Sequence, residues 1–179
     1  MGQGFLWLKK GLEKLQKPMA MKPVRAFFIA LAALALCWLP VYLACFPGIT
    51  GYDMGLQSVM IRTGNYTTHH PLAHTLLMGL CVRLGHALGQ INLGAALYTV
   101  IQIISLAACF ALACASIARQ SSTRAARFGL LYFALYPLHM MMAVNATKDV
   151  LFSGLFALTL ALAREALTFK MSKRLFAVL

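Results

Sequence analysis

Two short polar stretches carry most of the side chains in this sequence that could do chemistry. The first holds Asp53 and the adjacent pair His69 and His70, and the second holds Lys148 followed by Asp149. A carboxylate can activate an incoming hydroxyl group, and a cation can hold phosphate oxygens. The chain has only 4 Asp and Glu residues, and two of them lie in these stretches. This favours a site that handles an anionic substrate.

Each of these residues also has a purely structural interpretation. Asp53 could be the N-cap of a short helix over 54–63. Lys148 and Asp149 could be a pair at the start of a helix, where a carboxylate favours the helix dipole. The adjacent histidines precede a proline and could simply end a solvated loop. They also lack a further metal ligand at fixed spacing, so the signal for a metal is weak. From the residues alone, a functional cluster and ordinary loop polarity both stay open.

The rest of the chain is too apolar for a water-soluble domain. Of its 179 residues, 61% are hydrophobic and 11% are charged, whereas a soluble domain carries about 25% charged residues. Runs of about 20 apolar residues are typical of bilayer-spanning helices. The net charge of +12 does not indicate nucleic-acid binding, because the basic residues flank apolar segments, where membrane topology places them. The sequence therefore predicts an all-α membrane protein.

The apolar segment 71–89 decides how many times the chain crosses the bilayer. On a helical wheel, Leu76, Leu80 and Leu84 belong to one leucine stripe, and His74 and Arg83 fall outside it. A helix in the membrane interface has such a two-faced distribution, whereas a lipid-facing span is apolar all round. We therefore expect this segment not to cross, which leaves about four spans. They are 24–45, 93–117, 126–144 and 150–167.

The distribution of basic residues agrees with this topology. With four spans, all 16 Lys and Arg residues except Arg62, Arg83 and Lys148 fall on one side. Segments with many basic residues beside a span stay in the cytoplasm. We therefore predict that the protein lies in the cell membrane and that its N-terminus is on the cytoplasmic side. Residues 1–22 are predicted to form a basic amphipathic cytoplasmic segment. The outer loop with interfacial helices, 46–92, then meets the turn at 145–149 on the non-cytoplasmic face.

The loop after the first span resembles the first outer loop of multi-pass GT-C glycosyltransferases. The residues that carry the resemblance are Phe46-Pro47-Gly48, Tyr52-Asp53, Gln57, Tyr66, His69-His70-Pro71, His74-Thr75-Leu76-Leu77, Gly79, Tyr136-Pro137 and Lys148-Asp149. It covers about residues 24–165 and is greatest with a bacterial set of uncharacterised GT-C-like proteins. Mannosyl- and aminoarabinose-transferring membrane enzymes are more distant. Many relatives have a second acid where this chain has Met54, and Lys-Pro-Pro where it has His69-His70-Pro71.

The resemblance implies a transferase that takes a sugar from a polyprenyl-phosphate-linked donor on the non-cytoplasmic face, among membrane lipids. It makes Asp53 the catalytic carboxylate. Substrate or phosphate binding is implied for Gln57, Arg62, Tyr66, His69, His70, Lys148 and Asp149. A divalent metal could orient the acceptor, but neither a metal nor the acceptor is specified. Such enzymes have many more spans, so the GT-C-like module 23–179 is expected to be an N-terminal portion, truncated at its C-terminus.

Two other functions stay open. A non-enzymatic membrane partner or transporter subunit would use the polar residues inside the spans, Gln102 and His139, because such residues form interhelical hydrogen bonds or serve function. A lipid-phosphate hydrolase would use the outer cluster, but its product would be inorganic phosphate rather than a glycoconjugate. The membrane glycosyltransferase is the interpretation that the sequence favours.

Overall fold

The computed structural model describes residues 23–168, and almost all of its regular structure is helical. The predicted amphipathic segment 1–22 lies outside the described residues, as do residues 169–179. The elements are α2 (Pro23–Ala44), β1 (Ile49–Thr50), α3 (Tyr52–Thr63), α4 (Leu72–Ala87), α5 (Ile91–Gln120), α6 (Thr123–Leu135), α7 (Pro137–Val144), β2 (Asn145–Ala146) and α8 (Lys148–Thr168). The predicted all-α membrane protein is confirmed.

Three of these helices are long and apolar enough to cross a membrane. They comprise Val24–Ala44, Ile91–Gln120 and Lys148–Leu167. Helices α6 and α7 pass the same test together but are bent by 55° at a short break. The part of the chain that the structure describes therefore has 3 helices that could span a membrane, or up to 4 spans if the bent pair is one. The predicted segment 71–89 is not among them, because α4 has only 16 residues.

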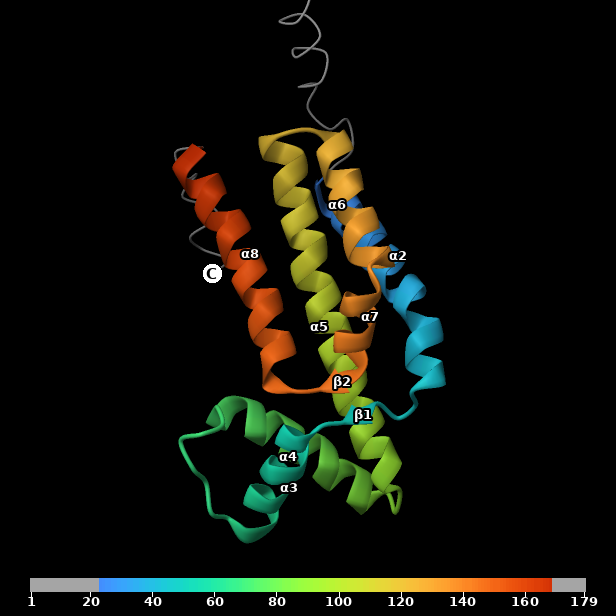
Figure 1. The fold of residues 1–179 in the computed structure, drawn as a ribbon, viewed down its shortest axis with the longest axis vertical. Helices are drawn as coiled ribbons and strands as arrows, with labels where there is room; N and C mark the ends of the chain where they lie inside the picture. The colour runs from blue at the N-terminus through green and yellow to red at the C-terminus, as the bar shows by residue number, and fades with distance from the viewer. Residues whose placement is uncertain (1–22, 169–179) are drawn as a thin grey trace, which may run out of the picture.

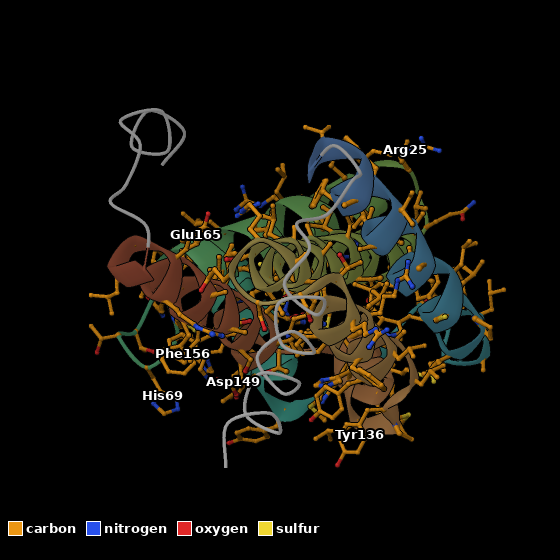
Figure 2. The ribbon with its side chains drawn as sticks, turned by 90° about the horizontal axis from the view of Figure 1, so that it is seen from above. Arg25, His69, Tyr136, Asp149, Phe156 and Glu165 are labelled. Carbon is orange, nitrogen blue, oxygen red and sulfur yellow. The ribbon has the colours of Figure 1, made fainter. Side chains whose placement is uncertain are left out.

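Helix α5 is the centre of the bundle. In its apolar stretch 56% of the residues are buried, against 17% for α2 and 11% for α8. Figure 2, which looks along the bundle, shows α5 between α8 on one side and α2 on the other. The outer helices therefore turn most of their apolar surface away from the protein, as expected for helices that face lipid.

The break between α6 and α7 has a clear cause in the sequence. Pro137 has no backbone N–H, so the carbonyl of Phe133 loses the hydrogen bond that a continuous helix would supply. The indole of Trp38, which is completely buried, donates to this carbonyl with an Nε1···O distance of 3.2 Å. A side chain of α2 therefore satisfies the backbone group that the proline leaves open.

The short helices α3 and α4 form a separate layer at one end of the bundle, together with β1 and β2 (Figure 1). The turn between α5 and α6 and the last turns of α8 lie at the opposite end. Helix α3, Tyr52–Thr63, begins before Asp53 and includes the short helix over 54–63 that the N-cap interpretation of Asp53 assumed. This arrangement places the predicted outer loop and the turn before α8 at the same end.

Helix α4 is two-faced, as the leucine stripe predicted. Leu76, Leu80 and Leu84 are exposed, whereas His74 and Thr75 are buried against the protein. Two other polar residues that fall outside the stripe, Arg83 and His86, are exposed. On the buried side Gly85 and Gly94 let the backbones of α4 and α5 come together, because a Cβ on Gly85 would lie 2.5 Å from the Gly94 nitrogen.

A labelling experiment can test whether α4 crosses the membrane. In a chain whose native cysteines are replaced, single cysteines at Thr67 and Gln90, which flank α4, should both react with an impermeant thiol reagent in intact cells. Both positions are exposed, and a helix that does not cross keeps its two ends on one side. A cysteine at Ser121, at the opposite end of the bundle, is the control that should stay unlabelled. Labelling at Thr67 without labelling at Gln90 would mean that α4 spans the bilayer.

Candidate functional site

The two polar stretches meet through a very small parallel sheet. Strand β1 pairs with β2, with Ile49 opposite Asn145 and Thr50 opposite Ala146. One residue after each strand a helix begins, α3 after β1 and α8 after β2. Because the two strands are parallel and in register, the N-termini of the two helices lie side by side. The second residue of α3 is Asp53, and the second residue of α8 is Asp149.

An ion pair joins the two helix starts. The Nζ of Lys148 lies 2.7 Å from Oδ2 of Asp53, across 95 residues of sequence. The N-cap of α3 is Gly51, so the structural alternative that made Asp53 an N-cap is wrong. The hydrogen bond from Lys148 lowers the pKa of Asp53 below its ordinary value of 3.8, and the charges of the nearby His70 and His69 act in the same direction. Asp53 is therefore a permanently ionised carboxylate at neutral pH.

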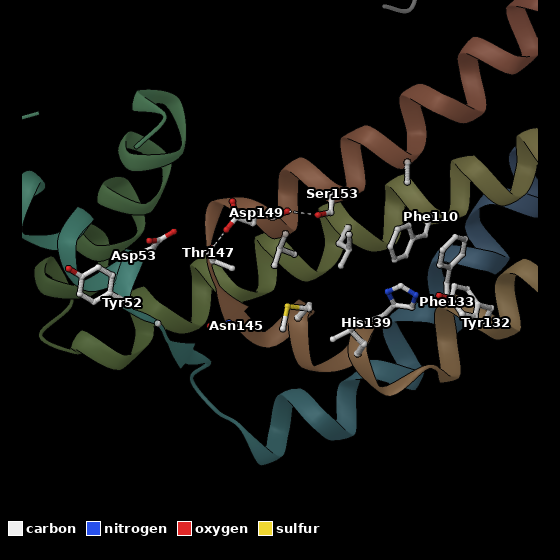
Figure 3. Close-up of a pocket in the computed structure, with 16 residues that line it drawn as sticks. Tyr52, Asp53, Phe110, Tyr132, Phe133, His139, Asn145, Thr147, Asp149 and Ser153 are labelled. Carbon is white, nitrogen blue, oxygen red and sulfur yellow. Dashed lines mark hydrogen bonds between the residues drawn. The ribbon is translucent and has the colours of Figure 1, made fainter. Parts of the chain in front are cut away.

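A cleft of about 630 Å³ runs from these helix starts into the bundle (Figure 3). Its mouth is polar and includes Asp53, Asn145, Thr147, Asp149 and Ser153. The Ser153 hydroxyl donates to the Asp149 carbonyl at 2.7 Å, which fixes the first turn of α8. Further in, the walls are apolar and consist of residues from α5, α6, α7 and α8: Leu106, Phe110, Phe133, Leu138, Met142, Val150 and Ala157. The cleft is thus polar at one end and apolar along its length.

The inner end of the cleft holds an imidazole among aromatic rings. The ring of His139 lies 5.1 to 5.5 Å, centroid to centroid, from those of Phe110, Tyr132, Phe133 and Tyr136. Its Nε2 is buried and has no hydrogen-bond partner among residues 23–168. Sequence reasoning noticed His139 only as a polar residue within a span. The aromatic residues on either side of Pro137 were the signal that could have indicated a cleft at this break.

The structure separates the predicted site residues into three groups. Asp53 and Asp149 line the cleft, and Lys148 contacts Asp53 without lining it. Tyr66, His69 and Arg62 are exposed, and none of them lines the cleft.

The remaining two lie beneath the surface. Gln57 is completely buried, and its amide is 3.0 Å from Nδ1 of His74. His70 is buried beside the ring of His69, and neither of its nitrogens has a partner within the described part of the chain.

The charged groups of the cleft mouth do not form a closed metal site. Within residues 23–168 no group of three or more His, Cys, Asp and Glu side chains is placed to hold a metal ion. Asp53 and Asp149 alone do not supply the ligands that a structural metal requires. Beside these two carboxylates lie Lys148 and the N-termini of α3 and α8.

Removing Lys148 should change the pKa of Asp53 but hardly change the free energy of unfolding of the protein. The pair stabilises the folded chain above pH 3.8, and this contribution is lost only as the pH falls through the lowered pKa of Asp53. Because the partners are 25% and 22% exposed, the pair contributes about 1 kcal/mol or less. We expect Lys148→Met to raise the pKa of Asp53 towards its ordinary value.

The measurement is a ¹³C NMR titration of the aspartate carboxyl groups in detergent. The sequence has two aspartates, so Asp149→Asn assigns both resonances. Arg83→Met, which removes a cation from α4 outside the cleft, is the control and should leave both titration curves unchanged. An unchanged titration of Asp53 in Lys148→Met would contradict the ion pair.

A family match covers the greater part of the chain. Residues 59–175 match the family described as a family of unknown function, DUF6020. No curated protein and no solved structure matches the chain. The matched stretch begins within α3, after Asp53, and contains His70, Lys148 and Asp149. Since it spans well over half of the sequence, the chain belongs to the DUF6020 family.

Proposed function

We propose that this chain is a membrane glycosyltransferase of the GT-C type, or the N-terminal part of one, which takes a sugar from a polyprenyl-phosphate-linked donor. The observation that carries the proposal is the cleft, whose mouth has two carboxylates and whose length is apolar. A lipid-linked sugar has the same distribution of polarity. Its head would lie at the helix starts and its prenyl chain between α8 and the bent pair α6 and α7.

The walls of the cleft make a small polar substrate a poor occupant. Phe110, Phe133 and Val150 offer no hydrogen bonds, so polar groups placed against them would lose their bonds to water without replacement. A prenyl chain has no polar groups to leave unsatisfied there, so it can move from the surrounding lipid into the cleft without this cost. Because α8 is mostly exposed on its outer side, a lipid within the bilayer is close to the cleft throughout its length.

The head-group region has the charges that a phosphate-linked sugar needs. The N-terminal ends of α3 and α8 favour anions, and Lys148 adds a full positive charge beside them. In the proposed step the acceptor oxygen forms a bond to the anomeric carbon as the bond to the phosphate oxygen breaks. The polyprenyl phosphate leaves with the bonding electrons. Asp53 lies where it could accept the acceptor's proton, and its lowered pKa keeps it ionised for this role.

The basic residues at the two ends of the bundle bear on which side of the membrane the cleft mouth faces. Arg62, Arg83 and Lys148 belong to elements at the end of the bundle where the cleft mouth lies, whereas the described basic residues nearer the other end are Arg25, Arg119, Arg124, Arg127 and Arg164. With the positive-inside rule, this distribution supports the proposed position of the mouth on the non-cytoplasmic face of the cell membrane. The acceptor could reach that face from outside, and membrane lipids would surround the spans.

The polar residues in the spans support the transporter alternative less well than the cleft supports the glycosyltransferase. It needs Gln102 and His139 on a continuous pathway. Gln102 is completely buried, and its amide nitrogen already donates to the carbonyls of Ala143 and Asn145 at 3.0 and 2.8 Å. Its oxygen accepts from Tyr98, so it has little capacity left for a transported ion. The hydrolase alternative differs in its product, inorganic phosphate.

Asp53→Asn should abolish most turnover while leaving the fold intact. The amide keeps the shape of the side chain but cannot take a proton, and general-base help is worth roughly 10²–10⁴ in rate. We expect turnover to fall at least about a hundredfold, measured as release of polyprenyl phosphate from polyprenyl-phosphate-linked hexoses in proteoliposomes. Glu165→Gln, the same change near the far end of α8, is the matched control. Near-normal transfer by Asp53→Asn would remove the catalytic assignment, and release of inorganic phosphate would favour the hydrolase.

Filling the cleft should prevent lipid binding. Ala157→Phe places a ring in the apolar part of the cleft, because Ala157 lines it. Ala163→Phe adds the same ring to the same helix at an exposed position outside the cleft. We expect the first variant to weaken binding of undecaprenyl phosphate by about tenfold or more, equivalent to about 1.4 kcal/mol. Native mass spectrometry in detergent measures this binding. Equal affinity in both variants would show that the prenyl chain does not use the cleft.

A further inference from the structure

A line of buried side chains runs beneath the cleft mouth and joins three helices. The Nε2 of Gln57 lies 3.0 Å from Nδ1 of His74, and Nε2 of the same imidazole lies 2.5 Å from the hydroxyl of Tyr98. That hydroxyl is 3.0 Å from Oε1 of Gln102. Gln57, Tyr98 and Gln102 are completely buried, and His74 is 8% exposed. We call these four residues the buried relay.

The hydrogen bonds of the relay have one consistent direction. Gln102 donates through Nε2 to the carbonyls of Ala143 and Asn145, so its Oε1 must accept the Tyr98 proton. The oxygen of Tyr98 then accepts from Nε2–H of His74, which leaves Nδ1 to accept from the amide of Gln57. This assigns the neutral Nε2–H tautomer to His74. Burial lowers the pKa of His74 from its ordinary 6.5, with a smaller effect of Lys148, and so favours this neutral form.

The two ends of the relay lie on the segments that carry the ion pair. Gln57 is one helical turn after Asp53 in α3. At the other end, the Asn145 carbonyl belongs to β2, three residues before Lys148. The ion pair of Asp53 and Lys148 therefore joins α3 to the start of α8 at the surface, and the relay joins α3 to the adjoining strand β2 in the interior.

We propose that Tyr98 and His74 are positioning residues, which hold α3 and β2 together so that Asp53 and Lys148 face the cleft mouth as a pair. This inference rests on the proposed function for its catalytic meaning, but the positioning itself does not require a substrate. A core of apolar side chains could fill the same space. Buried polar groups that hydrogen-bond to one another instead specify one arrangement of the segments that they join. Of the relay's polar side-chain atoms, Oε1 of Gln57 has no partner among residues 23–168.

Disulfide trapping can measure the positioning directly. A Cβ added to Gly51 would lie 3.3 Å from the side chain of Asn145, so cysteines at these two positions would be neighbours. Gly51 has an extended backbone that any residue can adopt, and Asn145→Cys keeps the carbonyl that Gln102 contacts. In the full chain without its native cysteines, the Gly51→Cys, Asn145→Cys pair should cross-link rapidly under mild oxidation.

Tyr98→Phe removes the hydroxyl that links His74 to Gln102 and leaves the ring in place. We expect cross-linking to slow by about tenfold, the effect of losing roughly one buried hydrogen bond. Tyr42→Phe is the matched control, because within residues 23–168 the only hydrogen bond of the Tyr42 hydroxyl is to the Ala96 carbonyl, at 3.5 Å and away from the relay. It should cross-link at the original rate. Gln57→Leu, which cuts the relay at its α3 end, is the second variant and should behave like Tyr98→Phe.

Binding and turnover separate positioning from the proposed chemistry. These measurements use the chain in which Gly51 and Asn145 are the native residues. There, Tyr98→Phe should bind undecaprenyl phosphate with an affinity within about twofold of the original, while its rate of turnover falls by about tenfold. Unchanged cross-linking in both Tyr98→Phe and Gln57→Leu would overturn the positioning role. Slower cross-linking in a chain that shows no sugar transfer at all would support the positioning and contradict the proposed function.

Discussion

The pairing of β1 with β2 is the constraint on which the arrangement of the site depends. Each strand has only two residues, yet the parallel register fixes where α3 and α8 begin relative to each other. The positions of Asp53, Lys148 and Asp149 follow from that register, and so does the position of the cleft mouth. So short a ladder would not persist alone in water. It persists here because Gln102 binds the Asn145 carbonyl from below and Gly48 passes closely over Thr99 of α5, where a Cβ would lie 2.2 Å from the Thr99 hydroxyl.

The same bundle shows how non-helical backbone is accommodated at membrane depth. An unpaired carbonyl in hydrocarbon is costly, so irregular backbone occurs there only where the protein satisfies it. Open carbonyls lie on both sides of the short helix α7, in the last turn of α6 before it and at its own C-terminal end and β2 after it. Trp38 donates to the carbonyl of Phe133 before it, and Gln102 donates to those of Ala143 and Asn145 after it. These two side chains come from different helices. They allow the chain to bend at Pro137, and the bend gives the inner cleft its aromatic wall.

Much of the fold could be predicted from the sequence, because the apolar runs reflect the hydrocarbon core of the bilayer and the basic residues reflect its cytoplasmic side. The spans follow from runs of apolar residues, and the two faces of α4 follow from the helical spacing of its leucines. The site was predicted only as a set of residues at one end. A two-residue strand has no periodic pattern, so its pairing with a strand 96 residues further along the chain could not be predicted. Nor could the burial of Gln57, because an isolated glutamine in a polar stretch looks the same whether it faces solvent or His74.

The energetics of the ion pair bear on whether Asp53 is merely structural. Both partners are partly exposed, and such pairs contribute about 0–1 kcal/mol. The strand pairing and the buried relay already hold α3 against α8 without it. A carboxylate that adds so little to the stability is still one of only 4 in the chain, and it lines the cleft. Its partner keeps it ionised at the one end of the cleft where a charged head group would lie. The structural role is thus too small to account for its placement, and this supports the proposed contact of Asp53 with a substrate.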